Sequence, residues 1–144
     1  MFTTNPNDSC LSFCTINIKN KDEMLGAISN ILNLKKDKDV IIVSDHIDIQ
    51  IYNEAKLYLE VFQKPIGLPT FVDICSAKLN SFIFDFESFL RKLAIELKSE
   101  IFIDQNNKGF IITPSNEIRI VDYDFVYIEE EECIIIRSNK KIDE

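Results

Sequence analysis

Apolar residues recur at helical spacing in two segments of this chain, and most other apolar residues fall in short segments that alternate like β-strands. The first helical segment follows Asn20 and Glu23, which have the spacing of a capping box. The second follows Asp85, a favourable N-cap residue. The spacing therefore predicts helices over 21–34 and 86–98. Their apolar stripes contain Met24, Leu25, Ile28, Ile31 and Leu32, and then Phe86, Phe89, Leu90, Leu93, Ala94 and Leu97.

The remaining apolar segments are rich in β-branched and aromatic residues, which favour strands. Segment 54–62 has a composition that also suits a helix, but Leu57, Leu59 and Val61 alternate, and we interpret it as a strand. The other predicted strands cover 10–18, 70–74, 100–104, 109–113, 117–128 and 133–137. Segment 40–52 is predicted to form either two short strands joined by a turn at Ser44-Asp45 or one long strand with a bulge there.

Polar segments separate these elements. The charged run at 35–39 and the Pro- and Gly-containing run at 64–69 predict loops, and we expect loose ends at 1–9 and 138–144. No linker divides the chain, so 1–144 is expected to form a single domain. The predicted class is α+β, with a mostly antiparallel sheet packed by two main helices.

Composition limits the functions open to this domain. Among its 144 residues, 24 are acidic and 16 are Lys or Arg, which gives a formal net charge of −8. This excess opposes direct binding to nucleic acid or to an anionic membrane surface. No apolar run approaches the roughly 20 residues of a membrane span. The first ten residues do not resemble a secretory signal, and we expect a cytoplasmic protein.

The cysteines Cys10, Cys14, Cys75 and Cys133 are scattered along the chain. Cys10 and Cys14 would share one face of a strand, where we interpret them as small core residues. Their spacing, without a nearby histidine, is a poor zinc signature. We therefore predict reduced cysteines and no metal site.

Catalytic motifs are not evident. His46 is the only histidine, and it lies beside Asp45 and two residues before Asp48. In an alternating strand, His46 and Asp48 would face solvent, so this group is a secondary candidate for partner binding. No Gly-rich phosphate loop and no nucleophile elbow is present. We expect no catalytic residues, no cofactor and no enzymatic activity.

Acidic residues concentrate in segment 117–132, which carries seven carboxylates against Arg119 and hence a formal charge of −6. Its carboxylates interleave with aromatic residues, as in binding surfaces where aromatics anchor and charges steer. Two other interpretations stay open: a solvated edge that prevents sheet pairing, and a divalent-metal site built from Asp122, Asp124 and a glutamate. The candidate partner-binding residues are Asp122, Tyr123, Asp124, Tyr127, Glu129, Glu130, Glu131 and Glu132.

Segment 86–126 resembles part of the small acidic bacterial immunity proteins of contact-dependent growth inhibition and related polymorphic toxin systems. The resemblance rests on the F-x₂-F-L-x₂-L-A-x₂-L helix at 86–97, the strand IFID, and the hairpin GFIITPSNEI that leads into an acidic strand. It covers under a third of the chain. It implies a cytoplasmic protein that binds and blocks one cognate toxin, commonly a basic nuclease. The resemblance implies no catalytic residues.

The leading hypothesis is therefore an immunity protein that neutralises a basic toxin, commonly a nuclease, by covering its active site. A toxin nuclease must present Lys and Arg to a phosphate backbone, so an acidic inhibitor would be steered to it. Two alternatives remain: a small carboxylate-dependent metal-binding hydrolase, and a phage or host regulatory module that binds another basic protein.

Overall fold

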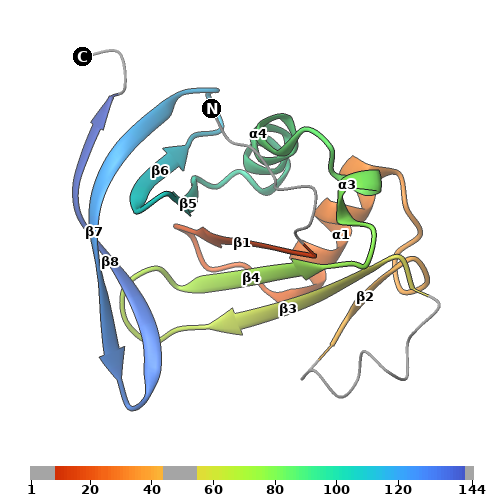
Figure 1. Cartoon of the computed structure of the whole chain (residues 1–144), viewed down its shortest axis with the longest axis horizontal. Helices are drawn as coiled ribbons and strands as arrows, with labels where there is room; N and C mark the ends of the chain where they lie inside the picture. The colour runs from red at the N-terminus through yellow and green to blue at the C-terminus, as the bar shows by residue number, and fades with distance from the viewer. Residues whose placement is uncertain (1–8, 44–54, 142–144) are drawn as a thin grey trace.

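Eight strands form one sheet in the computed structural model, which describes residues 9–43 and 55–141 (Figure 1). The order across the sheet is β2-β3-β4-β1-β5-β6-β7-β8, and neighbours are antiparallel except for the parallel pair β2 and β3. This arrangement confirms an α+β fold with a mostly antiparallel sheet. The strands are β1 Cys10–Thr15, β2 Val40–Ile42, β3 Leu57–Gln63, β4 Thr70–Cys75, β5 Ile101–Gln105, β6 Lys108–Ile112, β7 Ile118–Ile128 and β8 Glu131–Lys141.

The two predicted helices are present as α1 (Lys21–Leu32) and α4 (Phe86–Leu97). The Asn20 side chain accepts from the Glu23 N–H over 2.8 Å, which confirms the capping box. Asp85 accepts from the N–H of Ser88 over 3.0 Å. Helix α1 ends two residues before the predicted boundary, because Asn33 adopts the left-handed backbone that closes many helices. The sequence did not predict the third helix, α3 (Leu79–Phe82).

The sheet has an apolar core on each face. On one face, the helix stripes pack against strand residues such as Phe13 of β1 and Val72 of β4. On the opposite face, a smaller core contains Cys14 of β1, Phe102 of β5 and Ile134 of β8. Figure 1 shows the helices gathered on one side of the strands, with β7 and β8 at the far end. Alternation along the strands therefore supplies two different surfaces.

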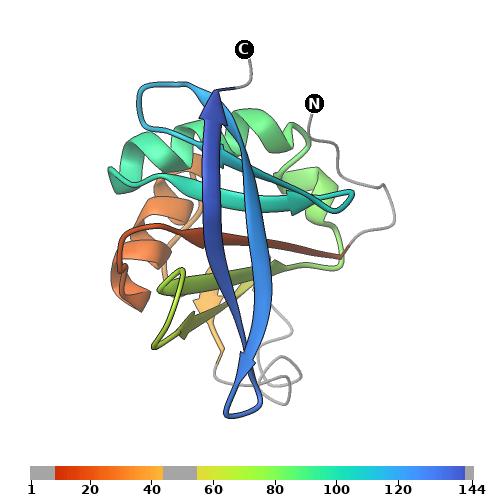
Figure 2. The same ribbon diagram turned by 90° about the vertical axis from the view of Figure 1, so that its left-hand side faces the viewer.

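Strands β7 and β8 form a long hairpin, which we call the ribbon. Strand β7 pairs with β6 only from Ile118 to Val121. The ladder is irregular between Asp122 and Tyr123, and beyond this point β7 pairs with β8 alone. Figure 2 shows the ribbon crossing in front of the other strands. A bulge that bends a strand accounts for this change of direction.

The outer half of the ribbon returns to the loop between β3 and β4. The backbone N–H of Leu68 in this loop donates to the carbonyl oxygen of Ile134 over 2.8 Å. Gly67 has a φ of +77°, and a Cβ there would collide with the same carbonyl. The ribbon is therefore held at two places, by β6 near its base and by this loop at Ile134.

Two strand predictions have clear outcomes. Strand β3 covers the segment 54–62 from Leu57 onward, which confirms the strand interpretation. Strand β8 continues to Lys141, past the predicted end at 137 and into the expected loose terminus. The strand predicted at 40–52 is present as β2 at its start, and its remainder from 44 onward lies outside the described residues.

The cysteine prediction is wrong for one pair, because Cys10 and Cys75 form a disulfide. They are 65 residues apart in the chain but directly opposite each other on β1 and β4, with Cα atoms 4.2 Å apart. Cys10 is exposed and is not a core residue. Cys14 and Cys133 are free thiols, as predicted; Cys14 is buried, as predicted, and Cys133 is buried as well. The register of two distant strands created the pair, and the sequence spacing did not reveal it.

Candidate functional site

The end of the ribbon carries four consecutive glutamates. Glu129 and Glu130 form the two-residue turn with φ values of 53° and 66°, and Glu131 and Glu132 begin β8. Two left-handed residues are typical of the turn that matches the twist of a β-hairpin. All four side chains are exposed. We call residues 127–132 the ribbon tip.

Nearer the sheet, the acidic residues of β7 have partners. The Asp124 carboxylate pairs with Arg137 over 3.0 Å, and the Ser138 hydroxyl donates to Asp122 over 2.8 Å. At the start of the ribbon, Arg119 contacts Glu117 over 3.2 Å. In contrast, Glu129–Glu132 have no ion pair with any basic side chain of residues 9–43 or 55–138. The uncompensated negative charge therefore lies at the ribbon tip.

The aromatic residues of β7 alternate with these aspartates. Tyr127 lies at the tip, opposite Glu132, and 74% of it is exposed. Tyr123 packs edge-to-face on Phe102 of β5 and on Phe125, with ring centroids 5.0 and 5.2 Å apart. The ribbon thus brings Tyr127 to the glutamates but directs Tyr123 toward the sheet.

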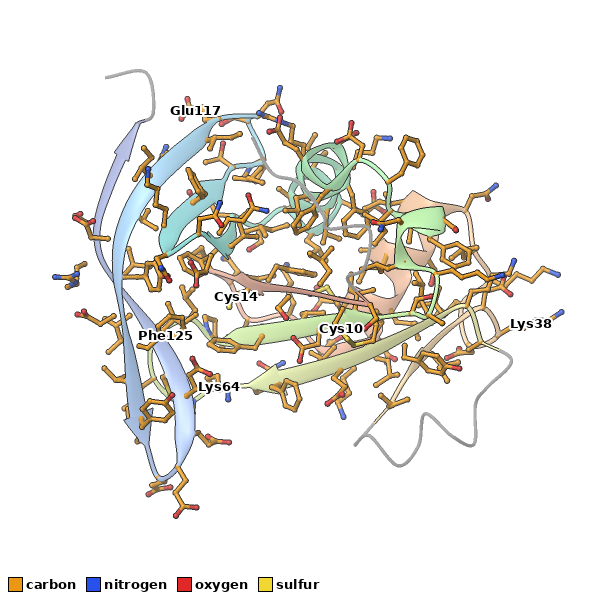
Figure 3. The ribbon with its side chains drawn as sticks, viewed as in Figure 1. Cys10, Cys14, Lys38, Lys64, Glu117 and Phe125 are labelled. Atoms are coloured by element: carbon orange, nitrogen blue, oxygen red, sulfur yellow. A yellow bond between two sulfur atoms is a disulfide. The ribbon has the colours of Figure 1, made fainter. Side chains whose placement is uncertain are left out.

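A cavity of about 430 Å³ lies between the ribbon and the face of the sheet opposite the helices, and we call it the ribbon cavity. Figure 3 shows Cys14, Lys64 and Phe125 around this space, from three different parts of the chain. Its aromatic walls are Phe62, Phe71, Phe102 and Phe125, and its charged groups are Lys64, Asp73, Asp104 and Glu132.

Hydroxyl groups orient two of these carboxylates. Ser12 donates its hydroxyl to Asp73 over 2.6 Å. The Tyr123 hydroxyl forms a hydrogen bond with Asp104. Burial, together with this hydrogen bond, raises the pKa of Tyr123 above its ordinary value. Burial, reinforced by the charge of Asp73, also raises the pKa of the Cys14 thiol. Cys14 is therefore a neutral thiol and a weak nucleophile at neutral pH.

The ammonium group of Lys64 lies over two of the aromatic rings that line the cavity. Its ammonium nitrogen lies 5.0 Å from the ring centroid of Phe71 and 5.8 Å from that of Phe62. Cations are attracted to the faces of aromatic rings at such distances. The ribbon cavity thus combines apolar walls, three carboxylates and one ammonium group.

The sequence did not predict this cavity. Asp104 ends its predicted strand, Asp73 lies inside the predicted strand 70–74, and both resemble ordinary surface positions. They reach one cavity because β4 and β5 lie on either side of β1. A carboxylate within an otherwise apolar strand was the only local signal.

The metal interpretation gains no support from the described side chains. No group of three or more His, Cys, Asp or Glu that could hold a metal ion occurs among them. Asp45, His46 and Asp48 lie outside the described residues. Among the helices that the structure describes, none has both the length and the apolarity to cross a membrane.

Comparison with protein-family models, with curated proteins and with solved structures found no match for this chain.

Proposed function

We propose that this chain is an immunity protein that binds a basic protein toxin through the ribbon tip and blocks it without chemistry of its own. The observation that carries this proposal is the set of four exposed glutamates at the end of the ribbon, beside the exposed ring of Tyr127. The resemblance of segment 86–126 to bacterial immunity proteins points to the same class.

The tip has the chemistry of a steering surface. Its carboxylates are at the end of a projecting hairpin and have no described basic partner, so an electropositive cleft would attract them over several ångströms. Tyr127 supplies a rigid apolar contact of the kind that anchors protein interfaces. A nuclease needs a basic cleft to hold a phosphate backbone. Occupying that cleft would exclude the nucleic acid.

Asp122 and Asp124 have a smaller part in this proposal than Glu129–Glu132. Their carboxylates are already held by Ser138 and Arg137. A partner would have to displace Arg137 to reach Asp124. We therefore place the main contact at the tip and treat the two aspartates as its border.

The test uses the partner captured from a lysate of the source organism on the immobilised protein. The tip variant Glu130→Lys/Glu131→Lys should associate roughly tenfold more slowly or worse, with a weaker salt dependence. The control Asp22→Lys/Glu96→Lys has the same charge change at exposed helix positions and should associate like the wild type. Surface plasmon resonance at two salt concentrations measures both. Equal association rates for the tip variant and the wild type would place the interface elsewhere.

A third variant, Asp122→Lys/Asp124→Lys, tests the contribution of the part of the ribbon between the tip and the sheet. We expect a smaller loss of association rate than in the tip variant. Inhibition of the partner's activity should fall in the same order, because occupancy of the cleft is the proposed mechanism.

Cytoplasmic location belongs to this proposal, and the disulfide offers a direct check. Thiols are kept reduced in the cytoplasm of most organisms. Rapid alkylation of intact cells, followed by mass spectrometry, would show whether Cys10 and Cys75 are free thiols in the cell. A fully oxidised pair would favour a more oxidising compartment.

A further inference from the structure

The ribbon cavity is a different site from the ribbon tip, and Glu132 is the one residue that borders both. It opens to solvent, and two of its walls, Phe62 and Phe125, are 38% and 45% exposed. Its volume of about 430 Å³ falls in the usual range of small-ligand sites, roughly 300–1,000 Å³. Apolar rings left in contact with water at such an opening gain free energy when a ligand covers them.

The charge of the cavity is unbalanced. Asp73, Asp104 and Glu132 face one ammonium group, that of Lys64, which leaves a formal charge of −2. The hydroxyls of Ser12 and Tyr123 orient the two aspartates without neutralising them. Within the described parts of the chain, none of the three carboxylates forms an ion pair with a basic side chain.

The aromatic walls already hold one cation. Lys64 extends from the end of β3 so that its ammonium group lies over the ring of Phe71 and near that of Phe62. The aliphatic stem of such a side chain can pack on the phenylalanine rings. Its positive charge can interact with the ring faces and with the nearby carboxylates. The contact of Lys64 with these rings therefore shows that the cavity accommodates an ammonium group on an aliphatic stem.

We propose that the ribbon cavity binds an organic cation, an ammonium or guanidinium group on an aliphatic stem. The stem would lie on the phenylalanine rings, and the cation would pair with Asp73 and Asp104. A free small molecule and a basic side chain of another protein can both present this group. The proposal does not depend on toxin binding, so either can fail without the other.

The test compares two probes of nearly equal shape, butylguanidinium and its neutral analogue butylurea. Each is titrated into ¹⁵N-labelled protein while amide shifts of β1, β4 and β5 are followed. Butylguanidinium should give saturable shifts with a Kd on the order of 1 mM, and butylurea should bind at least about tenfold more weakly. Equal binding of the two probes, or no saturable shift with butylguanidinium, would overturn the proposal.

Two variants test whether the probe binds at the ribbon cavity. Asp73→Asn/Asp104→Asn keeps the side-chain shapes and should weaken butylguanidinium binding by about tenfold or more. Glu96→Gln removes an exposed carboxylate on the helix side of the sheet and should change nothing. Unchanged binding by the double variant would contradict the proposal. Thermal melting of each variant confirms that the comparison is between folded proteins.

The variant Lys64→Met should raise the affinity for butylguanidinium, whereas the aspartate variant lowers it. It removes the resident cation, keeps an apolar stem and takes the formal charge of the cavity from −2 to −3. The probe should bind more tightly to this variant. Weaker binding would show that the ammonium group attracts the ligand, and a cation site would then be wrong.

A second arm identifies the source of the cation. The peptide acetyl-Gly-Arg-Gly-amide carries the same guanidinium group on a protein backbone. If it binds as well as butylguanidinium, the cavity accepts a basic side chain of a partner. If only the free cation binds, the cavity is a small-molecule site, and both results support a cation site.

Discussion

The backbone N–H of Leu68 donates to the carbonyl oxygen of Ile134 over 2.8 Å and so joins the β3–β4 loop to the outer half of the ribbon. Ile134 also lines the ribbon cavity, so this hydrogen bond is made to one of the cavity's walls. It requires a close approach that only a glycine at position 67 permits, because a Cβ there would overlap the Ile134 carbonyl. This loop–strand contact therefore adds a backbone hydrogen bond to the side-chain packing, such as Tyr123 on Phe102, that joins the ribbon to the sheet.

Gly67→Ala should destabilise the protein. The added methyl group meets backbone atoms of Ile134, and the φ of +77° is unfavourable for alanine. We expect a loss of about 1–3 kcal/mol in the free energy of unfolding, measured by urea denaturation. Gly26→Ala is the matched control, because nothing lies within 4 Å of its Cβ position and it is inside α1. The control should gain about 0.5–1 kcal/mol, and a neutral Gly67→Ala would contradict the close contact.

Leu93→Ala tests the helix side of the sheet. Leu93 is fully buried in α4 and belongs to the larger core, so the substitution should cost about 2–5 kcal/mol. Ile95→Ala on the same helix should cost far less, because 55% of Ile95 is exposed. Chemical denaturation of both variants measures the difference. Similar losses at the two positions would mean that the apolar stripe does not face the sheet.

Loss of the Cys10–Cys75 disulfide should lower stability. The bond closes a loop of 65 residues, for which loop-closure entropy alone gives about 4 kcal/mol. We expect dithiothreitol to lower the Tm of the wild type but not that of Cys10→Ser/Cys75→Ser. A wild-type Tm that is the same with and without reductant would show that this disulfide does not form in solution.

Stability should fall at alkaline pH through Tyr123. Burial, together with the hydrogen bond to Asp104, raises its pKa in the folded state above the unfolded value of 10.0. Unfolding then releases a proton above about pH 10, so the stabilisation present below that pH is lost as the pH rises toward the folded-state pKa. Tyr123→Phe should flatten the decline in Tm between pH 9 and about pH 11. An unchanged decline in this variant would assign the alkaline sensitivity to other groups.

Local patterns predicted the two long helices, α1 and α4, and most strands because their signals lie within a few residues. The Asn20 capping box and the stripe through Leu93 need no knowledge of the rest of the chain. The sequence also showed that carboxylates and aromatic residues interleave along the segment that forms β7. It did not show that Arg137 would neutralise Asp124, since that depends on the pairing with β8.

The disulfide and the ribbon cavity could not be predicted in the same way. Both depend on strand order, which places β1 between β4 and β5 although β4 is more than 50 residues away in the chain. Cys10 meets Cys75, and Ser12 meets Asp73, only through this register. Loop closure between distant strands leaves no periodic signal in the sequence.

The irregularity between Asp122 and Tyr123 divides the ribbon into two halves with different support. The inner half shares backbone hydrogen bonds with β6, whereas the described backbone bonds of the outer half are those with β8 and the one from Leu68. Amide protons of Asp124–Ile128 should therefore exchange with solvent through a local opening that leaves the central strands intact. Amino-acid changes at the tip would then alter the stability of this local opening and leave the free energy of unfolding of the central strands unchanged. The sequence of the tip can diverge rapidly while the sheet that carries it stays the same.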